Sequence, residues 1–281
     1  MMDKRERLAA IFRDTQQFYS TDPELMAAID AGRKNTKLYD VGNIPDFPEE
    51  ATRAGAVSVT KSRTYEAAMR LAKQHPGKRI AVLNFASATK PGGGVLSGSS
   101  AQEESLCRCS TLYPTLDRRF LWKAYYDVNR AAGDVLHTDA CIYSPGVVIC
   151  KTDTDFPERM AREDWCKVDV ISCAAPNLRK APGNQYSPEG GAAVSITPDG
   201  LQRIHEKRAR SILAVAARNG ADILVLGAFG CGAFRNDPKV VASAYANVLK
   251  ECRQHFDLIE FAIFCRGFET ENYDAFAEAL A

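Results

Sequence analysis

The sequence has no long apolar run and almost no net charge. None of its hydrophobic stretches reaches the roughly 20 residues that a membrane-spanning helix needs, and the opening MMDKRERLAA has no apolar signal core. The 36 basic residues are balanced by 35 acidic ones, so no strong positive field favours duplex nucleic acid or an anionic membrane. We therefore expect a protein that binds neither a membrane nor duplex nucleic acid.

Patterns typical of disulfides and metal sites are also missing. The nine cysteines are scattered and odd in number, without a repeated CxxC pattern, which indicates reduced thiols in a cytoplasmic protein. The four histidines show no pairing of metal-ligand type. Cys252 and His255 are three residues apart, but two further zinc ligands are lacking. We expect no metal and no cofactor.

At 281 residues and 46% hydrophobic, the chain is long enough to bury a large core. Apolar spacing predicts helices at residues 3–19 and 21–32, followed by a proline-punctuated connection. From about Ala54 onwards, strand patterns alternate with helix patterns, which favours a three-layer α/β/α fold. We predict one structural unit, in which a helical extension (residues 1–53) packs on a core domain (residues 54–281).

The predicted strands are the short apolar runs at residues 56–59, 79–85, 141–150, 168–174, 221–228 and 258–264. Helical patterns occupy residues 63–74, 102–113, 199–219 and 238–255. Because Pro145 and Gly146 interrupt residues 141–150, we expect that strand to run antiparallel and the sheet to be mixed. Residues 176–198, rich in Pro, Gly and Asn, are expected to form a long surface loop of the kind that often has a function.

Two glycine-rich turns directly follow predicted strands. The first reads ASATKPGGGVLSGSSAQEE, and the second reads LGAFGCGAFRNDP. Open α/β sheets bind ligands at the carboxyl ends of their strands, and glycine lets the backbone approach an anion closely. Neither turn has a P-loop lysine or the dinucleotide-binding spacing. They are either tight turns alone or, side by side, a cradle of backbone N–H groups for a diphosphate.

Two adjacent carboxylates, Glu103 and Glu104, end the first glycine turn. Like charges close together raise one pKa, which suits a general acid that works near neutral pH. The dipole of a helix beginning here would lower the same pKa, and the residues alone leave open which effect dominates. They also leave open a structural role, in which one carboxylate caps the helix and the other is solvated.

The string PGGG, then seven residues, then QEE (Pro91–Gly94 and Gln102–Glu104) resembles the signature of poly(ADP-ribose) glycohydrolases. Further blocks resemble the compact microbial branch of that family in the same order, between about Val57 and Phe264: LNFASATKPGGG, QEESLCRCSTLY, YSPGVVI, VISCAAPN and LVLGAFGCGAFRNDP. The resemblance implies a macrodomain-like fold, with a mixed central sheet and an N-terminal helical extension.

The resemblance also implies the ligand and the catalytic residues. The ligand would be ADP-ribose at the end of a polymer. Glu104 would donate a proton to the departing ribose oxygen and then accept one from the attacking water. Glu103 would hold ribose hydroxyls. The implied substrate-binding residues are Ser87, Gly92, Gly93, Gly94, Val95, Gln102, Gly227, Phe229, Gly230, Cys231, Gly232, Ala233 and Phe234.

Within this set, Ser87 stands where many macrodomains have a ribose-binding Asn, and Phe234 matches an aromatic position near the distal ribose. The sequence does not assign the adenine-binding residues, although a polar residue among residues 61–64 is one candidate. The implied substrates are poly(ADP-ribose) and ADP-ribosylated proteins, with cleavage mainly from the free end. Phe234 would form the wall that closes the distal ribose.

Three other functions remain open at this point. The first is a reader that binds ADP-ribose ends without catalysis, but a reader would not need the QEE carboxylates. The second is a hydrolase of mono-ADP-ribosyl or acyl-ADP-ribose groups, which differ in the leaving group. The third is a structural nucleotide-binding domain without any role in ADP-ribose chemistry.

Overall fold

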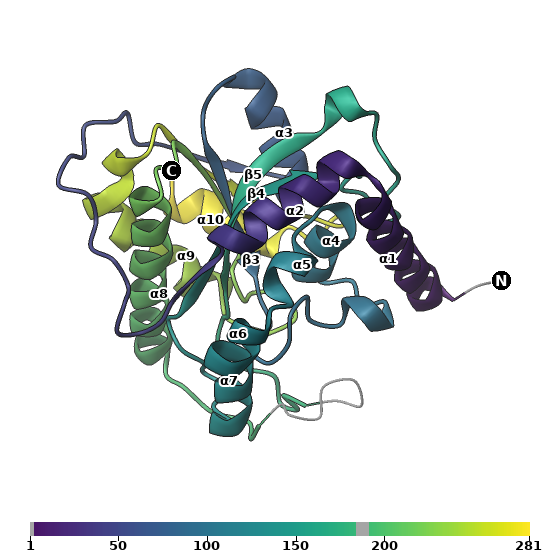
Figure 1. Ribbon diagram of the computed structural model, residues 1–281. Helices are drawn as coiled ribbons and strands as arrows, with labels where there is room; N and C mark the ends of the chain where they lie inside the picture. The colour runs from purple at the N-terminus through teal and green to yellow at the C-terminus, as the bar shows by residue number, and fades with distance from the viewer. Residues whose placement is uncertain (1–2, 184–190) are drawn as a thin grey trace.

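The computed structural model describes residues 3–183 and 191–281, and within them a seven-stranded mixed sheet forms the centre (Figure 1). The strands are β1 (Lys37–Tyr39), β2 (Ala56–Thr60), β3 (Ile80–Phe85), β4 (Cys141–Ile149), β5 (Cys166–Cys173), β6 (Ile223–Leu226) and β7 (Leu258–Ala262). Their order is β1-β4-β5-β3-β6-β7-β2.

The sheet is parallel from β5 to β2 and antiparallel at its other edge. β4 runs antiparallel to β5, and β1 runs antiparallel to β4. The β4–β5 register shifts between Ser144 and Val147, which is where Pro145 and Gly146 interrupt the strand. The predictions of a mixed sheet and of an antiparallel strand at 141–150 are therefore confirmed.

The helices cover both faces of the sheet. They are α1 (Lys4–Thr21), α2 (Pro23–Asn35), α3 (Thr64–Gln74), α4 (Gln102–Cys109), α5 (Tyr113–Leu116), α6 (Arg119–Leu121), α7 (Asp127–Ala132), α8 (Pro198–Arg218), α9 (Pro238–Cys252) and α10 (Glu271–Ala279), with a π-helix at Trp122–Tyr126 and 3₁₀ turns at Val95–Ser97, Arg162–Asp164 and Arg253–His255. In Figure 1, α8 and α9 lie on one side of the sheet, and α1, α2 and α4 lie on the other. This is the three-layer arrangement that the strand-helix alternation predicts.

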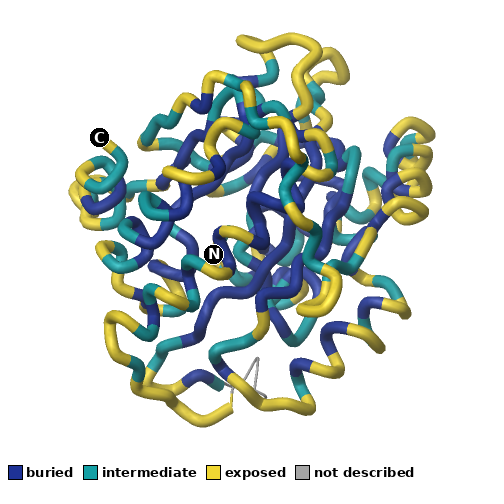
Figure 2. Tube along the Cα trace, turned by 90° about the vertical axis from the view of Figure 1, so that its left-hand side faces the viewer, coloured by how far each residue is buried: buried dark blue, intermediate teal, exposed yellow. Residues whose placement is uncertain are grey.

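Each face of the sheet has its own apolar core, because side chains alternate along a strand. On β3, Ala81 and Leu83 pack into the core that α8, α9 and α10 cover, whereas Ile80 and Val82 pack into the core under α3 and α4. Figure 2 shows these buried segments running through the centre, with exposed segments outside them. No helix of the described residues is long and apolar enough to cross a membrane.

The predicted elements are present, with ends that differ by a few residues. The predicted helix at 102–113 ends earlier, at Cys109, because Ser110 forms a β-bridge with Ile149. β1, α5, α6, α7 and α10 were not predicted. β1 lies within the predicted extension, so that segment adds a strand to the sheet edge; the domain boundary at residue 53 stays a prediction. Of the predicted loop 176–198, residues 184–190 lie outside the described residues.

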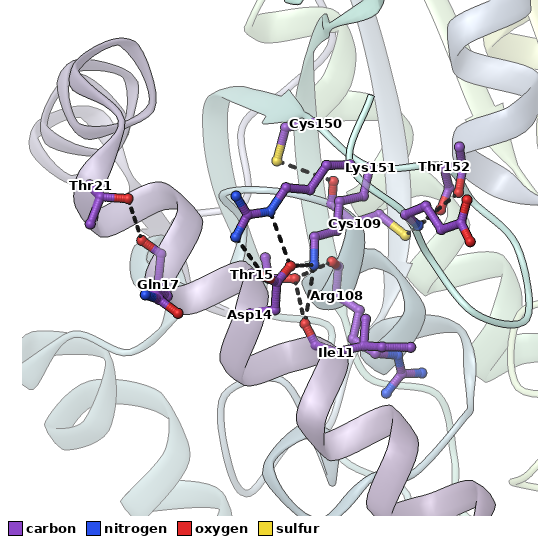
Figure 3. A network of polar contacts seen from close by, with 12 residues as sticks. Ile11, Asp14, Thr15, Gln17, Thr21, Arg108, Cys109, Cys150, Lys151 and Thr152 are labelled. Atoms are coloured by element: carbon purple, nitrogen blue, oxygen red, sulfur yellow. Dashed lines mark hydrogen bonds and ion pairs between the residues drawn. The ribbon is translucent and has the colours of Figure 1, made fainter. Parts of the chain in front are cut away.

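Helix α1 is fixed to the core by the buried side chain of Lys151, directly after β4 (Figure 3). This side chain is 1% exposed, and its Nζ donates to Asp14 Oδ2 at 2.6 Å and to the Ile11 carbonyl at 3.2 Å. A second contact joins α1 to α4, because Thr15 Oγ1 donates to the Arg108 carbonyl at 2.7 Å. Polar contacts with buried partners therefore determine where α1 lies.

Replacing Asp14 by Ala should lower the free energy of unfolding by about 1–3 kcal/mol, because the buried ammonium of Lys151 loses its carboxylate partner. Asp14→Asn should lose less, since the amide oxygen can still accept a hydrogen bond. Urea unfolding measures both values, with Asp30→Ala as a control at an exposed acid on α2. An unchanged unfolding midpoint for Asp14→Ala would show that the ammonium does not depend on this carboxylate.

Candidate active site

A cleft of about 800 Å³ opens where the parallel strands end. The segments that follow β2, β3, β5, β6 and β7 all contribute to its walls. Both glycine-rich turns line it, as expected for ligand binding at the carboxyl ends of a sheet. The first turn of α1 also contributes to a wall, through Lys4, Arg5 and Leu8.

The first glycine turn lies directly against the two carboxylates. Gly93 has a φ of +54°, a conformation that side chains disfavour. A Cβ at this position would lie 2.6 Å from Glu104 Oε1 and 3.0 Å from Glu103 Oε2. Gly93 is thus required both by the shape of the turn and by the space that the carboxyl groups occupy.

Glu103 is held by donors from the end of β3 and from the glycine turn. It lies in the first turn of α4 and is 3% exposed. Its Oε2 accepts a hydrogen bond from the Ser87 N–H at 2.7 Å, and its Oε1 lies 3.4 Å from Asn84 Nδ2. The Gly92 N–H also bonds to this carboxyl group. Glu103 is therefore fixed in orientation from three sides.

Glu104 is also buried, but it has fewer partners. It is 7% exposed, and its Oε1 accepts a hydrogen bond from the Gly94 N–H at 2.8 Å. Its Oε2 is buried and has no hydrogen-bond partner among the described residues. A buried polar atom without a partner is unfavourable, so this oxygen marks a place where a proton or a ligand group would be stabilised.

The environment of Glu103 raises its pKa. Burial, and then the charge of Glu104, raise the pKa of Glu103 to about 8, although the hydrogen bonds from Ser87, Asn84 and Gly92 act in the opposite direction. The sequence left open whether burial or the helix dipole dominates; in this site burial does.

Gln102 fixes the start of α4 to the sheet. Its Oε1 accepts from the Phe85 N–H at 2.9 Å, and its Nε2 donates to the Leu83 carbonyl at 2.8 Å and to Thr64 Oγ1 at 3.0 Å. The pairing of β6 with β3 ends at Val82. Beyond that residue, the Gln102 amide makes hydrogen bonds to the β3 backbone as a neighbouring strand would. Its polar atoms are occupied by the protein, which favours a positioning role over the predicted substrate contact.

The second glycine turn is held by a buried amide. Asn236 donates through Nδ2 to the carbonyls of Pro176 at 2.7 Å and Gly230 at 3.1 Å, and its Oδ1 lies 2.8 Å from His205 Nε2. Burial lowers the pKa of His205 to about 4, so this imidazole is neutral and acts as a structural partner. Phe229 packs behind the turn, with its ring 5.6 Å from that of Phe85.

The two turns differ in how their backbone N–H groups are used. In the first, the N–H groups of Ser87, Gly92 and Gly94 donate to the carboxylates, and that of Gly93 donates to the Lys90 carbonyl. These four N–H groups are therefore occupied within the protein, and a role of this turn in binding a diphosphate stays a prediction. In the second, the N–H groups of Gly230, Gly232, Ala233 and Phe234 make no hydrogen bond among the described residues.

The cleft brings together most of the predicted site residues. Those that line it are Ser87, Gly93, Gly94, Gln102, Glu103, Glu104, Gly230, Gly232, Ala233 and Phe234. The others lie behind the lining: Gly92, Val95, Gly227, Phe229 and Cys231. Val95, Phe229 and Cys231 are buried parts of the two apolar cores. The binding roles of all these residues stay predictions.

Several lining residues carried no signal in the sequence. His137 lines the cleft with a φ of +58°, and burial lowers its pKa to about 4. The Arg63 guanidinium stacks 4.0 Å above the Phe264 ring at another part of the wall. Of residues 61–64, the candidates for an adenine contact, 62–64 line the cleft. In the part of the chain that is described, no cluster of His, Cys, Asp and Glu is arranged to hold a metal ion.

Comparison with known proteins agrees with this geometry. The family model "Microbial-type PARG, catalytic domain" matches residues 8–152. The poly(ADP-ribose) glycohydrolase of Thermomonospora curvata, solved with the inhibitor ADP-HPD, is 32% identical, and the match covers 98% of this chain and 99% of that one with a TM-score of 0.80.

The corresponding enzyme of Deinococcus radiodurans, solved in complex with ADP-ribose, is 33% identical, with 90% of this chain and 96% of that chain covered and a TM-score of 0.74. No curated protein sequence matches the chain. The family model covers more than half of the sequence, and the structural matches cover nearly all of both chains. Together with the glycine turn and its paired glutamates, they show that the chain belongs to the microbial-type poly(ADP-ribose) glycohydrolase family.

Proposed function

We propose that this protein hydrolyses the ribose–ribose O-glycosidic bonds of poly(ADP-ribose) and releases ADP-ribose. The observation that carries the proposal is the pair Glu103 and Glu104, buried beneath a glycine turn in the wall of the cleft. The family membership and the solved relatives from T. curvata and D. radiodurans, one with an inhibitor and one with ADP-ribose, support it. A reader of ADP-ribose ends would have no use for two buried carboxyl groups.

The chemistry follows from the different surroundings of the two carboxyl groups. Three donors hold Glu103 in place, whereas Glu104 Oε2 is buried and has no hydrogen-bond partner among the described residues. Glu104 Oε2 is therefore the oxygen that can reach the substrate without first breaking a hydrogen bond. This carboxyl group is in position to act as the general acid.

In the reaction, the glycosidic C–O bond breaks and its electron pair stays on the departing ribose oxygen. Glu104 transfers its proton to that oxygen, which leaves as a hydroxyl group. A water molecule then attacks the oxocarbenium-like carbon, and Glu104 takes the proton that this water loses. Glu103 holds the ribose hydroxyls next to the sugar ring on which positive charge develops.

The second glycine turn is suited to the diphosphate. The N–H groups of Gly230, Gly232, Ala233 and Phe234 lie in one segment of the cleft wall and make no hydrogen bond among the described residues. Consecutive backbone N–H groups in a turn form a site for anions. We therefore place the diphosphate on this turn and the distal ribose beside the carboxylates of the first turn.

The substrates proposed are poly(ADP-ribose) and proteins that carry it. The proposed compartment is the cytoplasm, because all nine cysteines are free thiols, seven of them buried. Cysteines of this number in an oxidising compartment would usually be paired.

Glu104→Gln should reduce turnover by at least about a hundredfold, because the nearly isosteric amide cannot supply the proton and general acid catalysis is typically worth 10²–10⁴-fold. ADP-ribose affinity should stay within a few-fold of wild type. The measurements are ADP-ribose release from purified polymer and calorimetry with ADP-ribose. Glu103→Gln should instead lower both affinity and rate, because its ribose contacts exist before and during the reaction. Wild-type turnover by Glu104→Gln would exclude Glu104 as the acid.

Gly93→Val should reduce turnover by about a hundredfold, because displacing a catalytic group by about 1 Å has effects of that size. The added side chain overlaps both carboxyl groups, while the diphosphate contacts on the second turn remain, so ADP-ribose affinity should fall less than the rate. Gly77→Val is the matched control: Gly77 has a φ of +83°, but a Cβ there meets no atom within 4 Å. Equal losses of activity in both variants would assign the effect to backbone strain alone.

The position of Phe234 favours cleavage from the free end of the polymer. Its ring lies 6.3 Å from the His137 ring, and the Arg179 guanidinium lies 5.9 Å from its centre. The Leu178 N–H also donates to the Phe234 carbonyl at 2.9 Å, which ties the second turn to the segment after β5. An aromatic ring held between two segments forms a wall beside the proposed position of the distal ribose. In an internal unit the polymer continues from that ribose, so its chain would have to pass through this wall.

A digest of long polymer should therefore show ADP-ribose monomer at the earliest times, with few free oligomers. Phe234→Gly should raise the share of oligomers, because it removes the ring while keeping the backbone of the turn. Separating the products by chain length at a series of times measures this share. A wild-type digest dominated by oligomers from the start would overturn cleavage from the free end, while leaving the glycohydrolase proposal intact.

A further inference from the structure

Arg108 is a buried cation whose presence the mechanism above does not explain. It lies on α4, is 1% exposed, and lines the cleft. Its Nη1 donates to the Ser99 carbonyl at 2.6 Å, and its buried Nε has no hydrogen-bond partner among the described residues. Because an isolated buried charge is strongly unfavourable, a nearby negative charge must help to offset its burial.

The carboxyl pair at the start of the same helix is a source of that negative charge, with Glu104 acting most strongly on Arg108. Residues four apart lie on the same face of a helix, and long side chains point back towards the helix N-terminus. The guanidinium of Arg108 therefore extends along α4 towards Glu104, and Glu104 is the group that most favours its charged form. Burial acts against that charge and lowers the pKa of Arg108.

Arg108 is also joined to Glu104 by a closed ring of hydrogen bonds. Its Nη1 holds the Ser99 carbonyl, the Ser99 N–H donates to the Gly94 carbonyl at 3.0 Å, and the Gly94 N–H donates to Glu104 Oε1 at 2.8 Å. The α4 backbone closes the ring between Glu104 and Arg108. A shift of Arg108 is thus transmitted to the N–H group that orients the acid.

Contacts from α1 hold this ring from outside. Arg5 Nη2 donates to Ser99 Oγ at 3.1 Å, and Thr15 Oγ1 donates to the Arg108 carbonyl at 2.7 Å (Figure 3). The backbone of Arg5 also packs on Gly98, where a Cβ would lie 1.9 Å from the Arg5 carbonyl oxygen. Both ends of the Ser99–Arg108 contact are therefore fixed by one helix.

We propose that Arg108 is a positioning residue of the reaction: it holds the glycine turn on Glu104, and its charge stabilises the ionised pair that forms when Glu104 gives up its proton. This inference rests on the proposed glycohydrolase activity. After proton transfer, Glu103 and Glu104 are both negative in a space that excludes most water. A fixed cation on the same helix stabilises that state.

The other charged and titratable groups around this cation come from three elements. On α4 they are Glu103 and the thiols of Cys107 and Cys109, whose pKa values burial raises well above the usual range. Asp153 follows β4, and burial raises its pKa. Arg5 belongs to α1. Because neutral thiols carry no charge, the acidic groups that favour the charged form of Arg108 are Glu104, with the larger effect, and Asp153.

Two variants separate charge from geometry. Arg108→Met removes the charge and fills similar space with apolar atoms, and Arg108→Lys keeps the charge without the planar donor that reaches Ser99. We expect turnover by Arg108→Met to fall at least about tenfold, with ADP-ribose affinity within a few-fold of wild type. Its alkaline limit of activity should move up by about one pH unit, because the pair then holds its proton more tightly. Arg108→Lys should keep the wild-type limit and lose only part of the rate.

The pH profile of ADP-ribose release, with calorimetry and thermal unfolding of each variant, tests these expectations. The control is Arg79→Gln, since Arg79 donates to the Asn219 carbonyl at 2.6 Å at the opposite end of β3 and should leave the profile unchanged. A wild-type rate and pH limit in Arg108→Met, or an equal shift in Arg108→Lys, would overturn the proposal. Failure of both variants to fold would make Arg108 a purely structural residue. Absence of ADP-ribose release by the wild-type protein would instead overturn the glycohydrolase proposal itself.

Discussion

The burial of two adjacent carboxyl groups, Glu103 and Glu104, is the constraint on which the rest of the site depends. Removing carboxylates from water is strongly unfavourable unless donors or a proton compensate. Here the compensation comes from backbone N–H groups, at Ser87, Gly92 and Gly94. A side chain at Gly93 would overlap both carboxyl groups, so the glycine turn and the carboxyl pair require one another.

The same constraint explains why an N-terminal helix belongs to the site. The glycine turn ends in the segment 97–101, and that segment is held from α1 through Arg5 and from α4 through Arg108. α1 is in turn fixed by Lys151 and Thr15. The predicted extension, residues 1–53, therefore supports the turn that holds Glu103 and Glu104, although it contributes no carboxylate to the pair.

The sequence predicted the strands well because their cue is local. Alternating apolar residues on β3 belong to the two cores, and the glycine turns follow β3 and β6, so their place at the sheet edge was predictable. β1 was missed because three residues have no periodicity of their own and become a strand only by pairing with β4.

The sequence predicted which segments form the site, but not which of their side chains point into the cleft. Both glycine turns reach the cleft, yet Phe229 and Cys231 face the core, because the motif does not say which way a residue in a turn points. The pairing of Gln102 with β3 joins residues distant in sequence, and so do the contacts of Arg5 with the glycine turn. Only the packed structure reveals such contacts.

Two glycine turns in one cleft solve a problem that a single turn would not. The acid has to keep a proton near neutral pH and yet be able to release it. A diphosphate bound to the same N–H groups would place negative charge beside Glu103 and Glu104 and would hold that proton too tightly. In this chain the first turn donates to the carboxyl groups, whereas the N–H groups of Gly230, Gly232 and Ala233 on the second make no hydrogen bond among the described residues. In the proposed mechanism, the diphosphate therefore binds the second turn and the carboxyl pair stays on the first, with Arg108 on the same helix as the pair, so that a proton can move while the substrate is bound.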